Sequence, residues 1–269
     1  MEILSLLNSQ LSFAGQVSLI ATFALILGSF ASLISHRLAT KQPMVFARSQ
    51  CPKCKTALKI RNLIPLFSWI CQRGKCSNCK NKISARYPLI ELSFAISFLT
   101  VYLALGSQID LKTILCCLIA GTLIVMCVVD LEHYFIPDST QYFLAFLVIV
   151  LRIHEYGING ATMNIGAAFS YLGFGLLLLM FFYFTVRLEA IGIDDIKFFF
   201  TAGLLLGTQS LLLFMLFSGL FGAIFGSIWQ KVKRDSTFPF APAICMSLFI
   251  TMLFGSKINL IEIMGSLIF

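Results

Sequence analysis

Charged residues are scarce in this chain. They make up 12% of its 269 residues, whereas hydrophobic residues make up 58%. Ordinary soluble domains are about 25% charged, so this scarcity excludes a soluble globular protein. The mean hydropathy of +0.91 and the 27 phenylalanines indicate a polytopic membrane protein.

Basic residues are missing from the first part of the chain. Residues 1–13 contain neither Lys nor Arg, so they lack the positively charged region with which a cleavable secretory signal begins. The first apolar run, from Ala14 to Ile34, is long enough to span a bilayer. We therefore expect no cleavable signal and a first transmembrane helix within residues 1–35.

Acidic residues are absent between His36 and Tyr87. This segment holds twelve Lys or Arg and has a charge of +12, while the rest of the chain sums to −4. A basic loop beside the membrane stays on the cytoplasmic side and attracts anionic lipid head groups. Because no recognisable nucleic-acid module accompanies the charge, we expect membrane lipids as partners and no nucleic acid.

Apolar segments of spanning length recur along the chain and predict an all-α polytopic membrane protein with about eight transmembrane helices. They cover residues 14–35, 88–106, 112–130, 139–157, 165–187, 196–209, 211–229 and 242–257. We divide the chain into residues 1–35, a basic cytoplasmic loop at 36–87, and a seven-helix membrane core at 88–269. A cytoplasmic loop at 36–87 places the N-terminus outside and the short loops near 131–138, 188–195 and 230–241 inside.

Four cysteines in the basic loop have the spacing of a metal site. Cys51 and Cys54 form one C-x2-C pair, and Cys76 and Cys79 form a second after 21 residues. Two such pairs complete a tetrahedral zinc site, so we predict a zinc-ribbon-like loop. Four cysteine ligands leave no open position, which makes the zinc structural. Reduced cysteines or a redox pair remain the alternatives, and Cys71 is a competing ligand.

Two acidic motifs lie at helix ends on the predicted cytoplasmic side. Asp130, in VVDLEHYFIPD (128–138), ends the third predicted helix, and Asp195, in GIDDIKF (192–198), begins the sixth. Two carboxylates that share one proton can hydrolyse a peptide bond, since one takes a proton from water and the other polarises the carbonyl. Neighbours on a helix point about 100° apart, so only one of Asp194 and Asp195 can face Asp130.

The roles of the neighbouring charged residues are less specific. We expect Asp138 to cap the start of a helix. Lys197 either reaches the membrane interface or tunes the acidic pair. From the residues alone, an aspartic protease, a membrane transporter with intramembrane acids and a zinc-loop scaffold whose acids are only caps all stay open.

An ordered set of motifs resembles one family over most of the chain, from about residue 27 to 245. The set comprises LGSFASLISHRL (27–38), RSQCPKC (48–54), NLIPLFSWICQRGKCSNC (62–79), ISARYPLIEL (83–92), DLEHYFIPD (130–138) and FPFAPAI (238–244). It resembles the bacterial type IV prepilin leader peptidases, which also serve type II secretion. These are membrane aspartic proteases that are also N-methyltransferases.

The resemblance implies that residues 88–269 are a membrane aspartic protease core with Asp130 and Asp195 as catalytic residues. Asp194 stands where the family motif G-x-G-D-x-K has its second glycine, Ser32 where the family usually has Asn, and Ala241 in place of the glycine of a late P-F-G-P motif. Glu91 matches an acidic position of the family, and we expect it to pair with Arg86 or another base of the loop.

The resemblance also implies the substrate, the cofactors and the location. The substrates would be prepilins or pseudopilins, whose short basic leader is cut off between a glycine and a following residue that is commonly Phe. S-adenosylmethionine would then supply a methyl group to the new N-terminal amine, and zinc would be structural. The location would be the bacterial inner membrane, with multiple passes and the active site facing the cytoplasm. The oligomeric state stays open.

Overall fold

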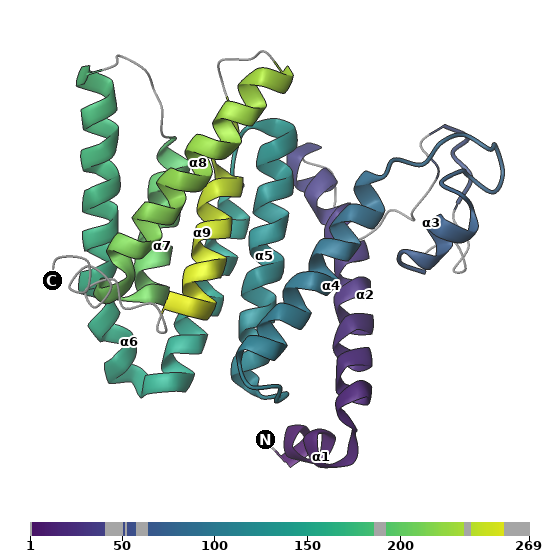
Figure 1. Ribbon diagram of the computed structural model, residues 1–269, viewed down its shortest axis with the longest axis horizontal. Helices are drawn as coiled ribbons and strands as arrows, with labels where there is room; N and C mark the ends of the chain where they lie inside the picture. Colours follow the sequence, from purple (N-terminus) through teal and green to yellow (C-terminus); the bar gives the residue numbers. More distant parts are fainter. Residues whose placement is uncertain are drawn as a thin grey trace, which may run out of the picture. The chain divides into compact units, whose positions relative to one another are not determined.

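A computed structural model describes residues 2–40, 51, 53–57, 64–185, 192–233 and 238–255. Its helices are α1 (Glu2–Gln10), α2 (Phe13–Thr40), α3 (Phe67–Cys71), α4 (Arg86–Ala104), α5 (Leu111–His133), α6 (Asp138–Thr185), α7 (Ile193–Leu206), η2 (Thr208–Ser210), α8 (Leu211–Lys233) and α9 (Ala241–Phe254) (Figure 1). Over these ranges no strand forms, and Lys75 and Lys82 are joined by an isolated antiparallel bridge. The predicted all-α class is confirmed.

Six helical segments among the described residues are long and apolar enough to cross a membrane. They are Phe13–Leu38, Arg86–Ala104, Leu111–His133, Asp138–Ile158, Asn164–Thr185 and Thr208–Lys233. The remaining two of the eight predicted segments are also helical, as α7 and α9, but each has only 14 residues. A bilayer core about 30 Å thick needs about 20 helical residues, so these two helices are too short to cross it fully.

Glycines mark the breaks between apolar helices. Gly157 lies inside α6 with φ 71° and ψ −175°, so α6 is two helices joined at a kink, which correspond to the fourth and fifth predicted spans. Gly207 follows α7 with φ 73°, and a short 3-10 turn then leads into α8. Glycine adopts this left-handed region without a steric penalty, so α7 and α8 are separate helices, like the sixth and seventh predicted segments.

The chain forms two compact units, Met1–Val125 and Met126–Phe269. In the first unit α2 packs against α4. A Cβ at Gly28 would lie 2.8 Å from the Cα of Glu91, so the absence of a side chain at Gly28 lets the two backbones approach. At one end of this unit, the side-chain amide of Asn8 in α1 binds the backbone N–H and C=O of Ile109.

In the second unit α7 packs against α6 and α9, and α8 packs against α9. A Cβ at Gly203 would come within 2.6 Å of the Cα of Ala168, which shows how closely α6 and α7 approach. The buried rings of Phe199 and Phe214 meet edge to face with their centroids 5.6 Å apart. This packing fixes the first turn of α7, where the predicted acidic motif lies.

Candidate functional site

Asp194 and Asp195 lie in the first turn of α7 but point in different directions. Asp195 is only 8% exposed, whereas the side chain of Asp194 is 38% exposed. Gly192, the residue before α7, is extended, and its N–H donates to Oδ2 of Asp195 at 2.9 Å. A carboxylate that binds a free N–H at a helix N-terminus is favourably placed, so the local cap turns Asp195 inward.

Asp130 lies in the last turn of α5 and is 6% exposed. Its Oδ2 accepts a hydrogen bond of 2.8 Å from the backbone N–H of Ala241. Ala241 is the first residue of α9, so the Asp130 carboxylate binds a free N–H at that helix N-terminus. The sequence prediction missed Ala241 because the contact uses its main chain. The prolines around it in FPFAPAI were the available signal, since they mark a helix start.

Asp130 and Asp195 are within electrostatic range of each other, and the more exposed Asp194 is within range of both. Within the described residues, each carboxylate uses Oδ2 for one main-chain N–H, and its Oδ1 accepts no hydrogen bond. The fold therefore brings together two residues that are 65 positions apart in sequence, each with one oxygen free.

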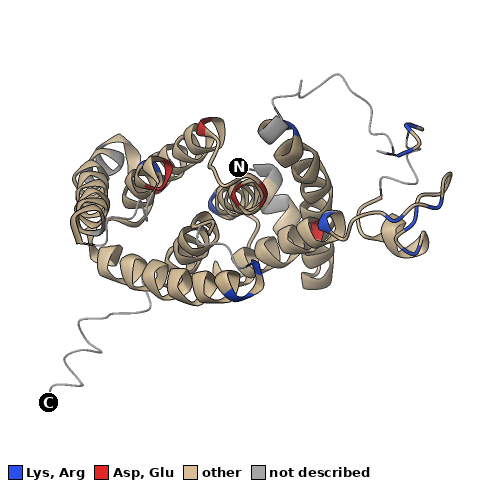
Figure 2. Ribbon diagram, turned by 90° about the horizontal axis from the view of Figure 1, so that it is seen from above, with Lys and Arg blue, Asp and Glu red and all other residues tan. Residues whose placement is uncertain are grey.

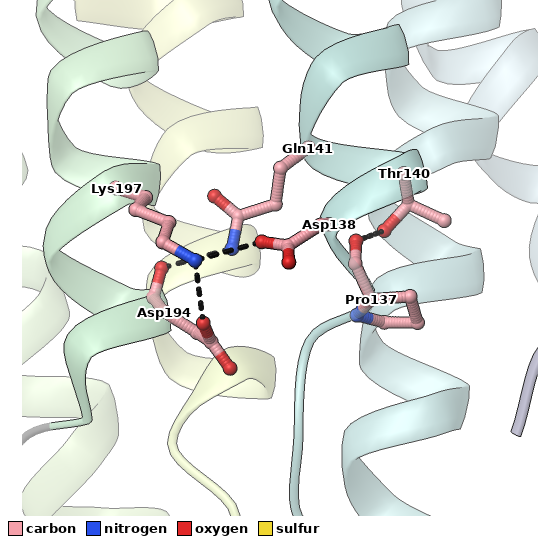
Figure 3. Close-up of polar contacts among 6 residues, drawn as sticks. All are labelled: Pro137, Asp138, Thr140, Gln141, Asp194 and Lys197. Carbon is pink, nitrogen blue, oxygen red and sulfur yellow. Dashed lines mark hydrogen bonds and ion pairs between the residues drawn. The ribbon is translucent and has the colours of Figure 1, made fainter.

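A polar cluster joins the first turns of α6 and α7 beside this pair (Figure 3). Nζ of Lys197 lies 2.7 Å from Oδ1 of Asp138 and 3.2 Å from Oδ1 of Asp194. The side-chain amide of Gln141 donates to the backbone oxygen of Asp194 at 3.0 Å. Asp138 is in the first turn of α6, as expected, but its carboxylate binds Lys197. Asp194 thus belongs to the exposed cluster, and Asp195 belongs to the buried pair.

The four predicted cysteine ligands converge in the loop between α2 and α4. The sulfur atoms of Cys51, Cys54, Cys76 and Cys79 all lie within 4.8 Å of one another, a spacing that could hold a metal ion. Cys71, at the end of α3, is exposed and lies outside this group. The predicted position of the site, between the first two spanning helices, is confirmed.

The two C-x2-C pairs have the same backbone geometry. In each, the first cysteine N–H donates to the oxygen five residues later, and the residue after the second cysteine donates back to the first. Lys55 and Lys80 occupy equivalent positions with the same φ of 56°. Hydrogen bonds from the Thr56 hydroxyl and backbone lower the pKa of the Cys54 thiol to about 6, whereas the neighbouring cysteines raise the pKa of the Cys79 thiol to about 11. The donor set fits a tetrahedral four-cysteine zinc site.

Glu91 is buried in α4 at 6% exposure. Its Oε2 accepts a 2.7 Å hydrogen bond from the backbone N–H of Leu66, just before α3. The Ser29 hydroxyl is a second partner. Arg86 binds the backbone oxygen of Ser32 and the hydroxyl of Ser35 on α2. Glu91 thus fastens the loop to α4, and Arg86 joins α4 to α2.

The chain resembles known proteins over most of its length. It is 30% identical over 246 residues to a prepilin leader peptidase/N-methyltransferase of Bacillus subtilis (strain 168), covering 90% of this chain and 96% of the relative. The protein of the same description from Legionella pneumophila is 29% identical, covering 81% of this chain and 76% of the relative. A third protein of this description, from Aeromonas salmonicida (strain A449), is 29% identical, covering 90% of this chain and 92% of the relative. No solved structure matches.

Two family models match successive parts of the chain. The Bacterial Peptidase A24 N-terminal domain matches residues 22–105, which include the cysteine cluster and Glu91. The Type IV leader peptidase family matches residues 117–227, which include Asp130, Asp195 and the Lys197 cluster. Together with the relative that is 30% identical along nearly its whole length, these matches show that the chain belongs to the type IV leader peptidase family of membrane enzymes.

Proposed function

We propose that this enzyme removes the short basic leader from type IV prepilins or type II secretion pseudopilins, with Asp130 and Asp195 as its catalytic carboxylates. The observation that carries the proposal is the buried pair: two acids from α5 and α7 interact with each other, and each is oriented by one main-chain N–H. The names of the relatives, which include prepilin leader peptidase, supply the substrate class.

The geometry suits general acid–base hydrolysis of a peptide bond. One carboxylate, ionised, takes a proton from a water molecule as that water attacks the scissile carbonyl carbon. The other, protonated, donates a hydrogen bond to the carbonyl oxygen and then passes its proton on as the amine leaves. The free Oδ1 atoms of Asp130 and Asp195 would be the atoms that accept the proton of water and donate the proton to the substrate. The bonds from Ala241 and Gly192 keep both Oδ2 atoms fixed meanwhile.

The site is placed at a membrane boundary in this proposal. Asp130 is in the last turn of α5 and Asp195 in the first turn of α7, so neither lies in the middle of its helix. We place this boundary and the basic loop on the cytoplasmic side, because the loop between α2 and α4 carries the chain's excess of Lys and Arg. A substrate with a cytoplasmic leader and a membrane helix would meet the acids at that level.

The direct test is leader cleavage of a co-expressed prepilin, followed as a gel shift. Asp130→Asn and Asp195→Asn should each lower cleavage by at least about a hundredfold, because general acid–base groups contribute that much or more. Asp194→Asn is the matched control, since it changes an adjacent acid that belongs to the exposed cluster. Cleavage that persists in both buried-site variants would refute the dyad. A requirement for Asp194 would move the site by one residue.

The proposed function includes methylation of the new N-terminal amine, because the relatives are also described as N-methyltransferases. S-adenosylmethionine would supply the methyl group. The mature pilin from cells with this enzyme should carry the mass of one extra methyl group on its first residue, measured by mass spectrometry of the N-terminal peptide. A processed but unmethylated product would leave the peptidase assignment in place and remove the second activity.

Zinc is proposed as the resident metal of the four-cysteine cluster, with a structural role. The four thiolates of Cys51, Cys54, Cys76 and Cys79 would be its ligands. With four sulfur ligands the ion has no open position for water or substrate. It would therefore hold the two C-x2-C turns together and take no part in peptide hydrolysis.

A further inference from the structure

The short helix α3 exposes an apolar face although it lies in a basic loop. Phe67 is 65% exposed and Ile70 62% exposed. Exposed Cys71 completes the face, since positions i, i+3 and i+4 of a helix lie on one side. Ile64, just before the helix, is 47% exposed as well. Bulky apolar side chains gathered on one face mark an interaction surface.

The opposite side of α3 is already anchored. The indole N–H of Trp69 donates to the backbone oxygen of Ile83. Its ring packs on Gly74, where a Cβ would lie 3.0 Å from the indole. These contacts join α3 to the segment that carries Cys76 and Cys79. The face formed by Phe67, Ile70 and Cys71, which we call the α3 face, therefore points away from the cysteine cluster.

Glu91 sets the level at which α3 is held. Its carboxylate accepts the N–H of Leu66, the residue before α3, at 2.7 Å. Glu91 is five residues after Arg86, where the spanning segment Arg86–Ala104 begins. At a rise of about 1.5 Å per residue, this is about 7 Å inside the end of the span. This contact holds the start of α3 beside the first turns of the spanning segment.

The charge around α3 is of one sign. No acid lies between His36 and Tyr87, so the only Asp, Glu, Lys or Arg in the described part of the loop are Lys and Arg, which are blue on the ribbon in Figure 2. Arg73 and Lys75 follow α3 directly and are the basic residues that border its apolar face. An apolar face bordered by Lys and Arg is the pattern with which interfacial helices enter an anionic membrane surface.

We infer that the α3 face inserts into the interfacial layer of an anionic bilayer, so that α3 is a membrane-surface anchor for the four-cysteine loop. Phe67 and Ile70 lie among the upper acyl chains, while the neighbouring Lys and Arg contact lipid phosphates. The anchor holds the loop against the membrane from which α2 and α4 emerge. This inference depends on the membrane-spanning helices and is independent of the proposed peptidase activity.

The test is photo-crosslinking of the full chain in vesicles. A benzophenone amino acid replaces Phe67 in one variant and Ile70 in a second. In the control variant it replaces Lys82, an exposed residue at the edge of the cysteine cluster. The vesicles contain phosphatidylcholine alone or with one third phosphatidylglycerol. Adducts with lipid should form at positions 67 and 70 and not at 82, with a yield at least about twofold higher in the anionic vesicles because the basic residues draw the face to the surface.

Several results would overturn the inference. One is the absence of a lipid adduct at both 67 and 70, and another is an equal yield at 82. A third is crosslinking of these positions only to a second copy of the chain or to co-expressed prepilin, which would make the face a protein-binding site. The tryptic pattern and metal content of each variant show that it is folded, and the two positions on the face guard against a local defect at either one.

Discussion

Asp194 and Asp195 show how much a single residue position decides. Helix geometry alone says that only one of them can face Asp130, and the sequence motif D-x-K favours Asp195. The structure adds a physical reason, because the Gly192 N–H binds the Asp195 carboxylate and turns it inward. Ala241 could not have been predicted in this way, since its contribution is a backbone N–H that is common to all residues but proline.

Lys197 should support the site without taking part in the chemistry. It is half-exposed and bound to Asp138 and Asp194, and ion pairs that water can reach contribute little to the stability of a fold. Lys197→Met should therefore reduce prepilin cleavage by less than about fivefold, and Lys197→Arg, which keeps the charge, should be closer to wild type. The measurement is the initial rate of leader removal in detergent-solubilised enzyme.

The opposite result for Lys197 would be equally informative. A loss as large as that of Asp195→Asn, with the protein still folded, would mean that the ammonium group acts on the carboxylate pair or on substrate. In that case the exposed cluster would belong to the catalytic site.

At the scale of elements, the apolar pattern predicted the long helices and missed the short ones. Each of the eight predicted segments is helical, because about 20 apolar residues in a row have few other stable arrangements in a bilayer. The five-residue helix α3 has no such pattern. Its position depends on hydrogen bonds from Trp69 to Ile83 and from Leu66 to Glu91, which join residues 14 and 25 positions apart and so leave no local periodicity.

Removal of zinc should loosen the loop before the helices. Purified protein should contain about one zinc per chain, the stoichiometry of a site with four cysteine ligands. Chelation, or Cys76→Ser, should increase tryptic cleavage between residues 51 and 82 several-fold, because the two C-x2-C turns lose the bond that joins them. The helical circular dichroism signal should stay unchanged.

Cys71→Ser is the matched control for zinc removal. It also replaces a loop cysteine, but one outside the cluster, so it should keep the metal and the protease resistance. A metal content below about half an equivalent with all four thiols reduced would contradict the four-cysteine site. Loss of zinc in Cys71→Ser would add Cys71 to the ligands.

At the scale of the whole molecule, six apolar helices and the family make the chain a multi-pass protein of the inner membrane. Its orientation stays a prediction that rests on the distribution of charge. The structure supplies one consistent contact: Asn8 near the N-terminus binds Ile109 between α4 and α5. Because two spanning helices, α2 and α4, separate Asn8 from Ile109 in the chain, both residues belong on the same side of the membrane. The basic loop between α2 and α4 lies on the opposite side.

Trypsin protection tests this orientation with the native chain. In inverted vesicles, trypsin should cut the loop between α2 and α4 at its many Lys and Arg and separate the first helix from the rest. In right-side-out vesicles the same loop should be protected, because it faces the lumen. Gln108→Cys, at an exposed position between α4 and α5, serves as the control: an impermeant thiol reagent should label it only in right-side-out vesicles. The reverse pattern for both probes would put the basic loop outside. A cytoplasmic leader could then not reach the Asp130–Asp195 pair, and the proposed function would be wrong.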